Sequence, residues 1–389
     1  MSSSSIKRPF DQYRLIPPNT IPRKALVPRK ATSVLPSWID PVTGLEYSYK
    51  ILGNKTALLV KVLNPTKVVT NFKVPSSITY LGNPVNVSKL GNFLFANNKN
   101  ISNTGNLEIP TTITSIGNNT FDRCSKLTGS LTLPGVKTIG SGAFAGCQGL
   151  TGVLTLTELK TISNLAFFGC SGFTGSLDLT GLKTIGYGAF LNCSGFTGSL
   201  NLTGVTSIGY SAFTECTGFT GSLNLTGVKT IGYSAFYQCK GFTGSLNLTG
   251  VKTIGFEAFN ECTGFTGSLN LTGVKTIGYG AFFKCSGFTG SLILSGVKNI
   301  SSFAFAGCSG FTGSLTLRGV KNIDSTAFNG CSGLTGSLTL PGVTSIGYGA
   351  FAECSGFTGS LDLTGVKTIE SEAFDGCKFT EILYPLSTS

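Results

Sequence analysis

Cysteine occurs in this chain at one fixed interval and nowhere else. The twelve cysteines are separated by steps of 23 residues, at Cys124, Cys147, Cys170, Cys193, Cys216, Cys239, Cys262, Cys285, Cys308, Cys331, Cys354 and Cys377. A Phe stands three residues before each Cys, and an Ile stands eight residues before it. A unit of 23 residues is too short to bury a core alone, so the units must stack. The sequence therefore predicts one repeat solenoid rather than several globular domains.

Each unit contains two kinds of local pattern. Residues 222–226, "SLNLT", alternate apolar and polar side chains, which predicts a short half-buried strand, and residues 227–232, "GVKTIG", form a second extended segment. In residues 234–239, "SAFYQC", the Phe and the Cys are three apart, which predicts one helical or 3₁₀ turn facing the core. Each coil is expected to contain two strands and one such turn.

The repeat resembles a known family. Residues 107–124, "LEIPTTITSIGNNTFDRC", follow the order L-x-I-P-x-x-V-x-x-I-G-x-x-A-F-x-x-C of the BspA-type (Treponema-type) leucine-rich repeat. The resemblance extends over about residues 44–384 and implies a leucine-rich-repeat β-solenoid with short strands. One departure begins at Thr128, where each unit gains a residue before the strand and loses one after it.

The chain is expected to contain four segments. Residues 1–43 read as a basic, Pro-rich extended arm, residues 44–100 as an N-terminal cap with a degenerate repeat, residues 101–378 as tandem repeats, and residues 379–389 as a C-terminal cap and tail. The arm is either a flexible tail or a docking segment for an acidic partner. Its basic residues are Lys7, Arg8, Arg14, Arg23, Lys24, Arg29 and Lys30.

Composition argues against catalysis. The chain has no His, which is the commonest general acid or base, and its 17 acidic residues are scattered. The cysteines form no Cys-x₂-Cys pair, so we expect no metal site and no cofactor. Equivalent Cys on stacked coils point the same way, whereas a disulfide needs facing Cβ atoms. We therefore predict a non-enzymatic protein whose cysteines are reduced and buried.

Two columns of repeated positions are candidates for binding a partner. A basic column includes Lys229, Lys252, Lys275 and Lys298, and an aromatic column includes Tyr187, Tyr210, Tyr233 and Tyr279. The lysines could equally serve only to prevent aggregation of the sheet, and the tyrosines could be partly packed. As a partner site, the two columns fit an acidic protein surface.

The function predicted from the sequence is that of a structural or protein-interaction scaffold, a rigid repeat rod anchored by its basic arm. It could belong to an assembly such as a particle or capsid. The family resemblance implies an alternative, a cell-surface binding protein or adhesin, and the basic residues leave a nucleic-acid or polyanion binder as a second alternative. Oligomeric state is left open.

No segment of the sequence reads as a membrane anchor or leader. The N-terminal residues lack the apolar core of a signal peptide, and no run of about 18 apolar residues could span a bilayer. We therefore expect a protein that does not follow the standard secretory route. Its expected place is inside the cell or within an assembly formed there, with the cell surface as the alternative.

Overall fold

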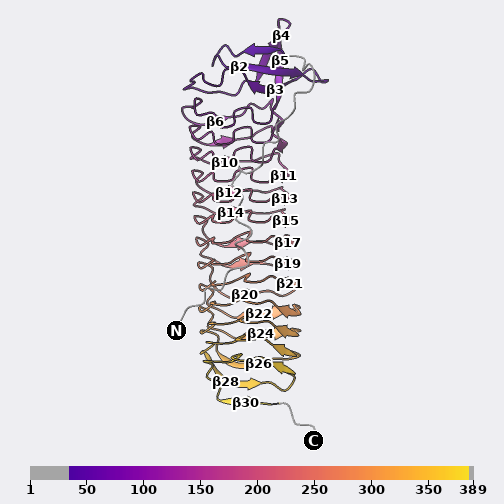
Figure 1. Cartoon of the computed structure of the whole chain (residues 1–389), viewed down its shortest axis with the longest axis vertical. Helices are drawn as coiled ribbons and strands as arrows, with labels where there is room; N and C mark the ends of the chain where they lie inside the picture. The colour runs from indigo at the N-terminus through magenta and orange to yellow at the C-terminus, as the bar shows by residue number, and fades with distance from the viewer. Residues whose placement is uncertain (1–34, 385–389) are drawn as a thin grey trace, which may run out of the picture. The chain divides into compact units, whose positions relative to one another are not determined.

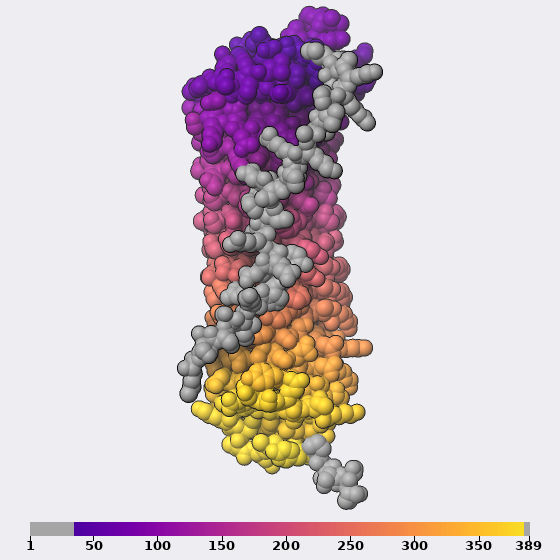
Figure 2. Space-filling model, in the orientation of Figure 1, coloured from indigo at the N-terminus to yellow at the C-terminus, as the bar shows by residue number. Residues whose placement is uncertain are grey.

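The repeats stack into a β-solenoid, as the 23-residue interval predicts. The computed structural model describes residues 35–384, and within them the coils follow one another in sequence order along the stack (Figure 1). The colours from indigo to yellow run in the same order over the surface of the described residues (Figure 2). The described part contains no helix with the length and apolarity that a membrane crossing requires.

The stack begins with an N-terminal group of longer strands. These are β1 (Ser37–Ile39), β2 (Glu46–Ile51), β3 (Ala57–Val62), β4 (Ser77–Tyr80) and β5 (Asn83–Leu90). Strands β1, β2 and β3 pair in antiparallel fashion, and β3 pairs with β5 in parallel. This group covers the first coil, because β5 pairs directly with β7 of the repeats.

Each following coil contributes one strand to each of two series. The first series comes from the "SLNLT" segments, and most members end at the polar residue after the first Leu. It consists of β6 (Leu107–Glu108), β8 (Leu131–Thr132), β10 (Leu154–Thr155), β12 (Leu177–Asp178), β14 (Leu200–Asn201), β16 (Leu223–Asn224), β18 (Leu246–Asn247), β20 (Leu269–Asn270), β22 (Leu292–Ser295), β24 (Leu315–Arg318), β26 (Gly336–Thr339), β28 (Phe357–Asp362) and β30 (Glu381–Leu383).

The second series comes from the "GVKTIG" segments, and each strand ends at the repeated Ile. It consists of β7 (Ser115–Ile116), β9 (Thr138–Ile139), β11 (Thr161–Ile162), β13 (Thr184–Ile185), β15 (Ser207–Ile208), β17 (Thr230–Ile231), β19 (Thr253–Ile254), β21 (Thr276–Ile277), β23 (Asn299–Ile300), β25 (Asn322–Ile323), β27 (Ser345–Ile346) and β29 (Thr368–Ile369). Strands β11 to β21 form one parallel six-stranded sheet. In this sheet Ile231 pairs with Ile208 and Ile254, so equivalent residues form straight columns.

Two columns of Phe fill the core between the two strand series. Phe236 is fully buried, and its ring stacks on Phe213 and on Phe259 with centroids 5.3 Å apart in each case. A second column, which includes Phe219 and Phe242, stacks in the same way. Because identical residues meet identical residues in every coil, one packing solution repeats along the stack.

The predicted helical or 3₁₀ turn is wrong in its details. Residues 234–239 form successive turns, and both Ser234 (φ 51°) and Gln238 (φ 56°) are left-handed, which a right-handed helix does not allow. The N–H groups alternate in direction: that of Phe236 donates to Ala258 O of the next coil at 2.8 Å, whereas that of Cys239 donates back to Phe236 O. Hydrogen bonding between coils therefore replaces the helix.

The glycine two residues after the Cys, present in the units from Cys147 to Cys354, is required by close backbone approach. A Cβ at Gly241 would lie 2.3 Å from Thr217 O and 2.4 Å from Phe219 O of the preceding coil. Carbonyl oxygens of a stacked coil cannot move away as a flexible side chain can. The Gly that recurs at this position therefore allows the coils to stack this closely.

We expect Gly241→Ala to lower the free energy of unfolding by about 1–3 kcal/mol or more, as overpacking does. Thermal unfolding followed by circular dichroism would measure the loss. The matched control is Gly221→Asn, because nothing lies within 4 Å of a Cβ at Gly221 and Asn tolerates its left-handed φ of 76°. Equal losses in the two variants would contradict the proposed backbone contact.

The predicted division into arm, cap, repeats and tail remains a prediction. Strand β1 lies inside the segment assigned to the arm, and β30 lies inside the segment assigned to the C-terminal cap. The seven basic arm residues predicted as partner contacts, Lys7 to Lys30, lie outside the described residues.

Candidate functional site

The predicted basic column lies along the N-terminal ends of the second-series strands. Each Lys directly precedes a second-series strand, and its backbone joins the ladder: Lys252 N–H donates to Lys229 O at 3.0 Å, and Lys275 N–H donates to Lys252 O at 2.9 Å. Lys229, Lys252, Lys275 and Lys298 are all exposed. The side chain of Lys252 follows the surface to the next coil, where Nζ lies 3.4 Å from Gly273 O.

The lysines of this column carry no neutralising partner. The structure of residues 35–384 contains one ion pair, between Lys240 and Glu261, and neither residue belongs to the column. Like charges on neighbouring strands, at the strand spacing of about 4.8 Å, repel each other by roughly 1 kcal/mol in water. An opposite charge laid along the column would relieve this repulsion.

The aromatic column forms a stacked stripe on the same sheet. Tyr233 follows β17 by two residues, so the stripe and the basic column flank the same strands. The rings of Tyr210 and Tyr233 are parallel, with centroids 4.7 Å apart, and both side chains are about half exposed. The stack continues through Phe256 and Tyr279 with centroid distances of 5.5 Å and 5.4 Å.

The stripe differs from the sequence prediction at both ends. The repeated aromatic position holds Ser302 in the coil after Tyr279, but the ring of Phe303, one residue later, has its centroid 5.3 Å from that of Tyr279. The turn keeps its register, because the equivalent residues Ser234 and Glu257 are left-handed as well, so a ring at this neighbouring position extends the stripe. Tyr187 is half-buried, and among the described residues it makes no ring contact with Tyr210. The stripe is therefore Tyr210, Tyr233, Phe256, Tyr279 and Phe303.

The cysteine column lies in the interior and offers no site on the surface. All twelve are free thiols, and only Cys377 is partly exposed. The thiol of Cys239 donates to Phe213 O at 3.0 Å, and that of Cys262 donates to Phe236 O at the same distance. Burial raises the pKa of the Cys170 thiol to about 12. No group of metal-binding side chains occurs in residues 35–384.

The comparisons with known proteins decide the family. The sequence matches the family described as "BspA type Leucine rich repeat region (6 copies)" over residues 66–174, 88–222, 183–312 and 275–389. The chain belongs to the BspA-type leucine-rich repeat family. The resemblance seen in the repeat is therefore confirmed, as is the solenoid. A comparison with curated proteins finds no match.

Solved structures with a similar fold come from several bacteria. A leucine rich cell surface protein from Faecalibacterium prausnitzii is 23% identical, with 92% of this chain and 97% of that chain covered and a TM-score of 0.50. A leucine-rich repeat protein from Bacteroides ovatus is 20% identical, with 86% and 98% covered and a TM-score of 0.44. The pneumococcal vaccine antigen PcpA is 15% identical, with 88% and 90% covered and a TM-score of 0.47.

The intracellular location predicted from the sequence is corrected by these findings, because the similar Faecalibacterium chain is described as a cell surface protein. Thiols that are equivalent and buried in a solenoid do not face one another in disulfide geometry, and an oxidant from outside does not reach them. A reduced cysteine column is therefore compatible with an oxidising environment, and it does not indicate a compartment.

Proposed function

We propose that this protein is a non-enzymatic protein-interaction scaffold at the cell surface, and that it binds a partner with an acidic surface through the sheet face that carries the basic column and the aromatic stripe. Family membership supports a protein-binding role. The description of the Faecalibacterium structure supports the surface location. Neither comparison supports a role as a particle component or as a nucleic-acid binder.

One observation carries the proposal: a basic column that lacks neutralising carboxylates within residues 35–384 runs beside a partly exposed row of aromatic rings at the same strands. Positive charge attracts an acidic partner and accelerates its association. Tyr side chains supply large rigid contact area and are enriched among the residues that dominate binding energy. The two columns run in parallel along the coils, so an elongated acidic surface could contact both.

The test reverses the charge of the column. In the variant Lys229→Glu, Lys252→Glu, Lys275→Glu and Lys298→Glu, we expect binding to immobilised poly-L-glutamate at low salt to fall by on the order of a hundredfold, because attraction becomes repulsion. Surface plasmon resonance would measure the change. A matched control reverses four exposed lysines elsewhere, Lys50, Lys55, Lys73 and Lys126, with the same change in net charge.

Three results would contradict the proposal. Equal losses in both variants would show that only net charge matters, and unchanged binding in the first variant would place the site elsewhere. Displacement of poly-L-glutamate by a single-stranded oligonucleotide at much lower concentration would favour the nucleic-acid alternative. Surface location is checked on intact cells with a membrane-impermeant amine reagent, which should modify the exposed lysines.

A further inference from the structure

A polar groove runs along a different side of the solenoid, next to the cysteine column. It has a volume of about 870 Å³. Its walls come from the residues directly before and directly after each Cys. Before the Cys these are Arg123, Gly146, Gly169, Asn192, Glu215 and Gln238. After the Cys they are mostly small hydroxyl residues, such as Ser171, Ser194 and Thr217. The groove therefore crosses successive coils instead of following one strand.

The groove contains backbone carbonyl groups that accept no hydrogen bond from residues 35–384. Gly146 and Gly169 bear no side chain there, and both are left-handed, with φ of 69° and 67°. Within the described residues, the backbone carbonyls of Gly169, Asn192 and Glu215 accept no hydrogen bond from the chain. Unsatisfied polar groups that recur along one groove are suited to a hydrogen-bonding ligand.

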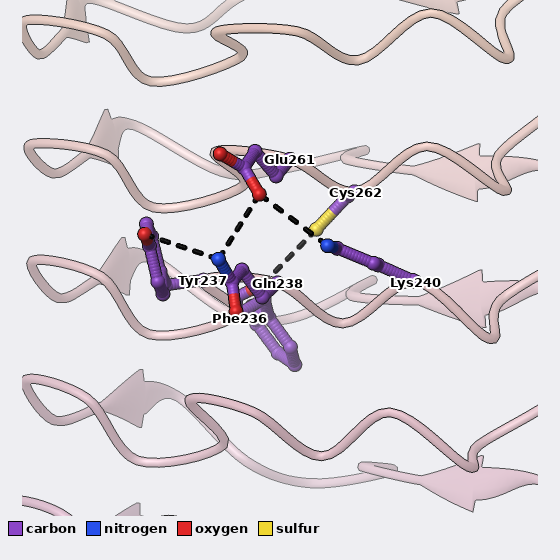
Figure 3. A network of polar contacts seen from close by, with 6 residues as sticks. All are labelled: Phe236, Tyr237, Gln238, Lys240, Glu261 and Cys262. Carbon is purple, nitrogen blue, oxygen red and sulfur yellow. Dashed lines mark hydrogen bonds and ion pairs between the residues drawn. The ribbon is translucent and has the colours of Figure 1, made fainter.

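The groove lining ends at Gln238, which belongs to a side-chain network between neighbouring coils (Figure 3). Lys240 Nζ lies 3.4 Å from Glu261 Oε2, and Gln238 Nε2 donates to the same oxygen at 3.0 Å. Lys240 directly follows one Cys and Glu261 directly precedes the next, so this ion pair joins the two walls. The equivalent positions one coil earlier are Thr217 and Gln238, and two coils earlier they are Ser194 and Glu215. Short hydroxyl side chains after the Cys keep the groove open.

We propose that this groove binds a neutral oligosaccharide that lies along the solenoid axis. From Asn97 to Gln238 the groove spans six coil steps, the first of 26 residues and the others of 23, which corresponds to about 29 Å at a strand spacing of about 4.8 Å. Its middle, from Gly146 to Ser194, presents hydroxyl, amide and backbone groups and no charge. The half-buried ring of Phe168 also lines the groove and offers an apolar face for a sugar ring.

Spacing favours a sugar chain over a peptide. The polar groups of the floor recur once per coil, at about 4.8 Å, whereas an extended peptide along the axis repeats every 3.2–3.4 Å. An extended peptide would therefore return to register only at every second coil, after about three residues. In a β-linked chain of pyranose rings, successive rings follow at nearly the coil spacing, so that one ring can meet one coil. Six coil steps then accommodate about six rings.

The network at this end of the groove lining shows how to block the groove in its middle. In Ser194→Lys, the new ammonium group would face Glu215 as Lys240 faces Glu261. We expect cellohexaose, mannohexaose or chitohexaose to bind the full chain in isothermal titration calorimetry, and we expect Ser194→Lys to weaken that binding at least tenfold. The control is Ser286→Lys, at the equivalent position outside the groove, where the next coil has Gly307 and no carboxylate. Its affinity should be unchanged.

The outcomes separate this proposal from the proposed function. Absence of binding by all three hexasaccharides, or equal affinity in Ser194→Lys and Ser286→Lys, would overturn the groove proposal and leave the basic column untouched. Binding of a neutral heptapeptide that Ser194→Lys abolishes would assign the groove to a peptide instead. If Ser194→Lys lowers the melting temperature, Ser171→Arg replaces it, since Ser171 is also exposed in the groove. Charge reversal of the basic column should not alter hexasaccharide affinity.

Discussion

Replacing Phe236 by alanine should lower the free energy of unfolding by about 3–5 kcal/mol, the usual cost of a large cavity in a core. The side chain is fully buried and stacks on Phe213 and Phe259, each at 5.3 Å. The substitution therefore removes contacts with both neighbouring coils as well as those within its own. Stacked aromatic pairs contribute about 0.5–1.5 kcal/mol beyond buried area, and two such pairs are lost.

Urea unfolding followed by far-UV circular dichroism would measure this loss. Lys229→Ala, on the exposed side of the same coil, is the control and should change the free energy of unfolding by less than about 0.5 kcal/mol. A long repeat array can unfold in segments, so the curves of the two variants are compared at several wavelengths for coincidence. A Phe236→Ala protein as stable as Lys229→Ala would mean that the Phe column does not hold the coils together.

The solenoid could be predicted from the sequence because every repeat unit makes the same contacts with the units before and after it. Once Cys, Phe and Ile recur at 23 residues, each residue must meet its own equivalent in the next coil, and the pairing of Ile231 with Ile208 and Ile254 follows. Alternating apolar residues in "SLNLT" then place Leu223 and Leu225 inside, as observed. These inferences need only spacing and polarity.

The helical turn could not be judged from spacing alone. A separation of three between Phe236 and Cys239 suits a helix, and it suits equally a chain of turns whose alternate N–H groups reach the next coil. Whether a helix or a chain of turns forms depends on the left-handed conformations of Ser234 and Gln238. These conformations cannot be predicted from the residue types. Stacking made the turns favourable because the next coil supplies acceptors such as Ala258 O.

The surface columns were visible in the sequence, and the groove was not. Lys229 and Tyr233 recur at fixed positions, so their columns follow from the repeat. The groove arises where small residues after the Cys, such as Ser171, coincide with bare glycines before it, such as Gly169, and its lining ends at Gln238, next to the ion pair of Lys240 and Glu261. The groove could have been found from the variation between otherwise similar units, because the run of Ser and Thr after the Cys, from Ser171 to Thr217, is interrupted at Lys240.

The buried cysteine column should make the fold unusually sensitive to alkali. Eleven thiols are buried, and burial raises their pKa: to about 12 for Cys170, and well above the ordinary value of 9.0 for Cys239 and Cys262. Below pH 9 the thiol is neutral in both the folded and the unfolded chain. Between pH 9 and 12 the unfolded chain loses these protons while the folded chain retains them, so ionisation favours unfolding.

The expected slope is large because so many equivalent groups act together. Each buried thiol should lower the free energy of unfolding by about 1.4 kcal/mol per pH unit above pH 9. The urea concentration at the midpoint of unfolding should therefore stay constant from pH 7 to 8 and decrease steeply between pH 9 and 10 for the reduced protein.

Two variants test whether the thiols cause this decrease. In Cys239→Ala the free energy of unfolding should decrease less steeply, by about 1.4 kcal/mol per pH unit, because one titrating group is absent. Val228→Ala, which removes buried volume in the same coil but no thiol, should be destabilised at every pH and keep the slope of the parent. Parallel curves for Cys239→Ala and Val228→Ala would show that thiol ionisation does not govern alkaline unfolding.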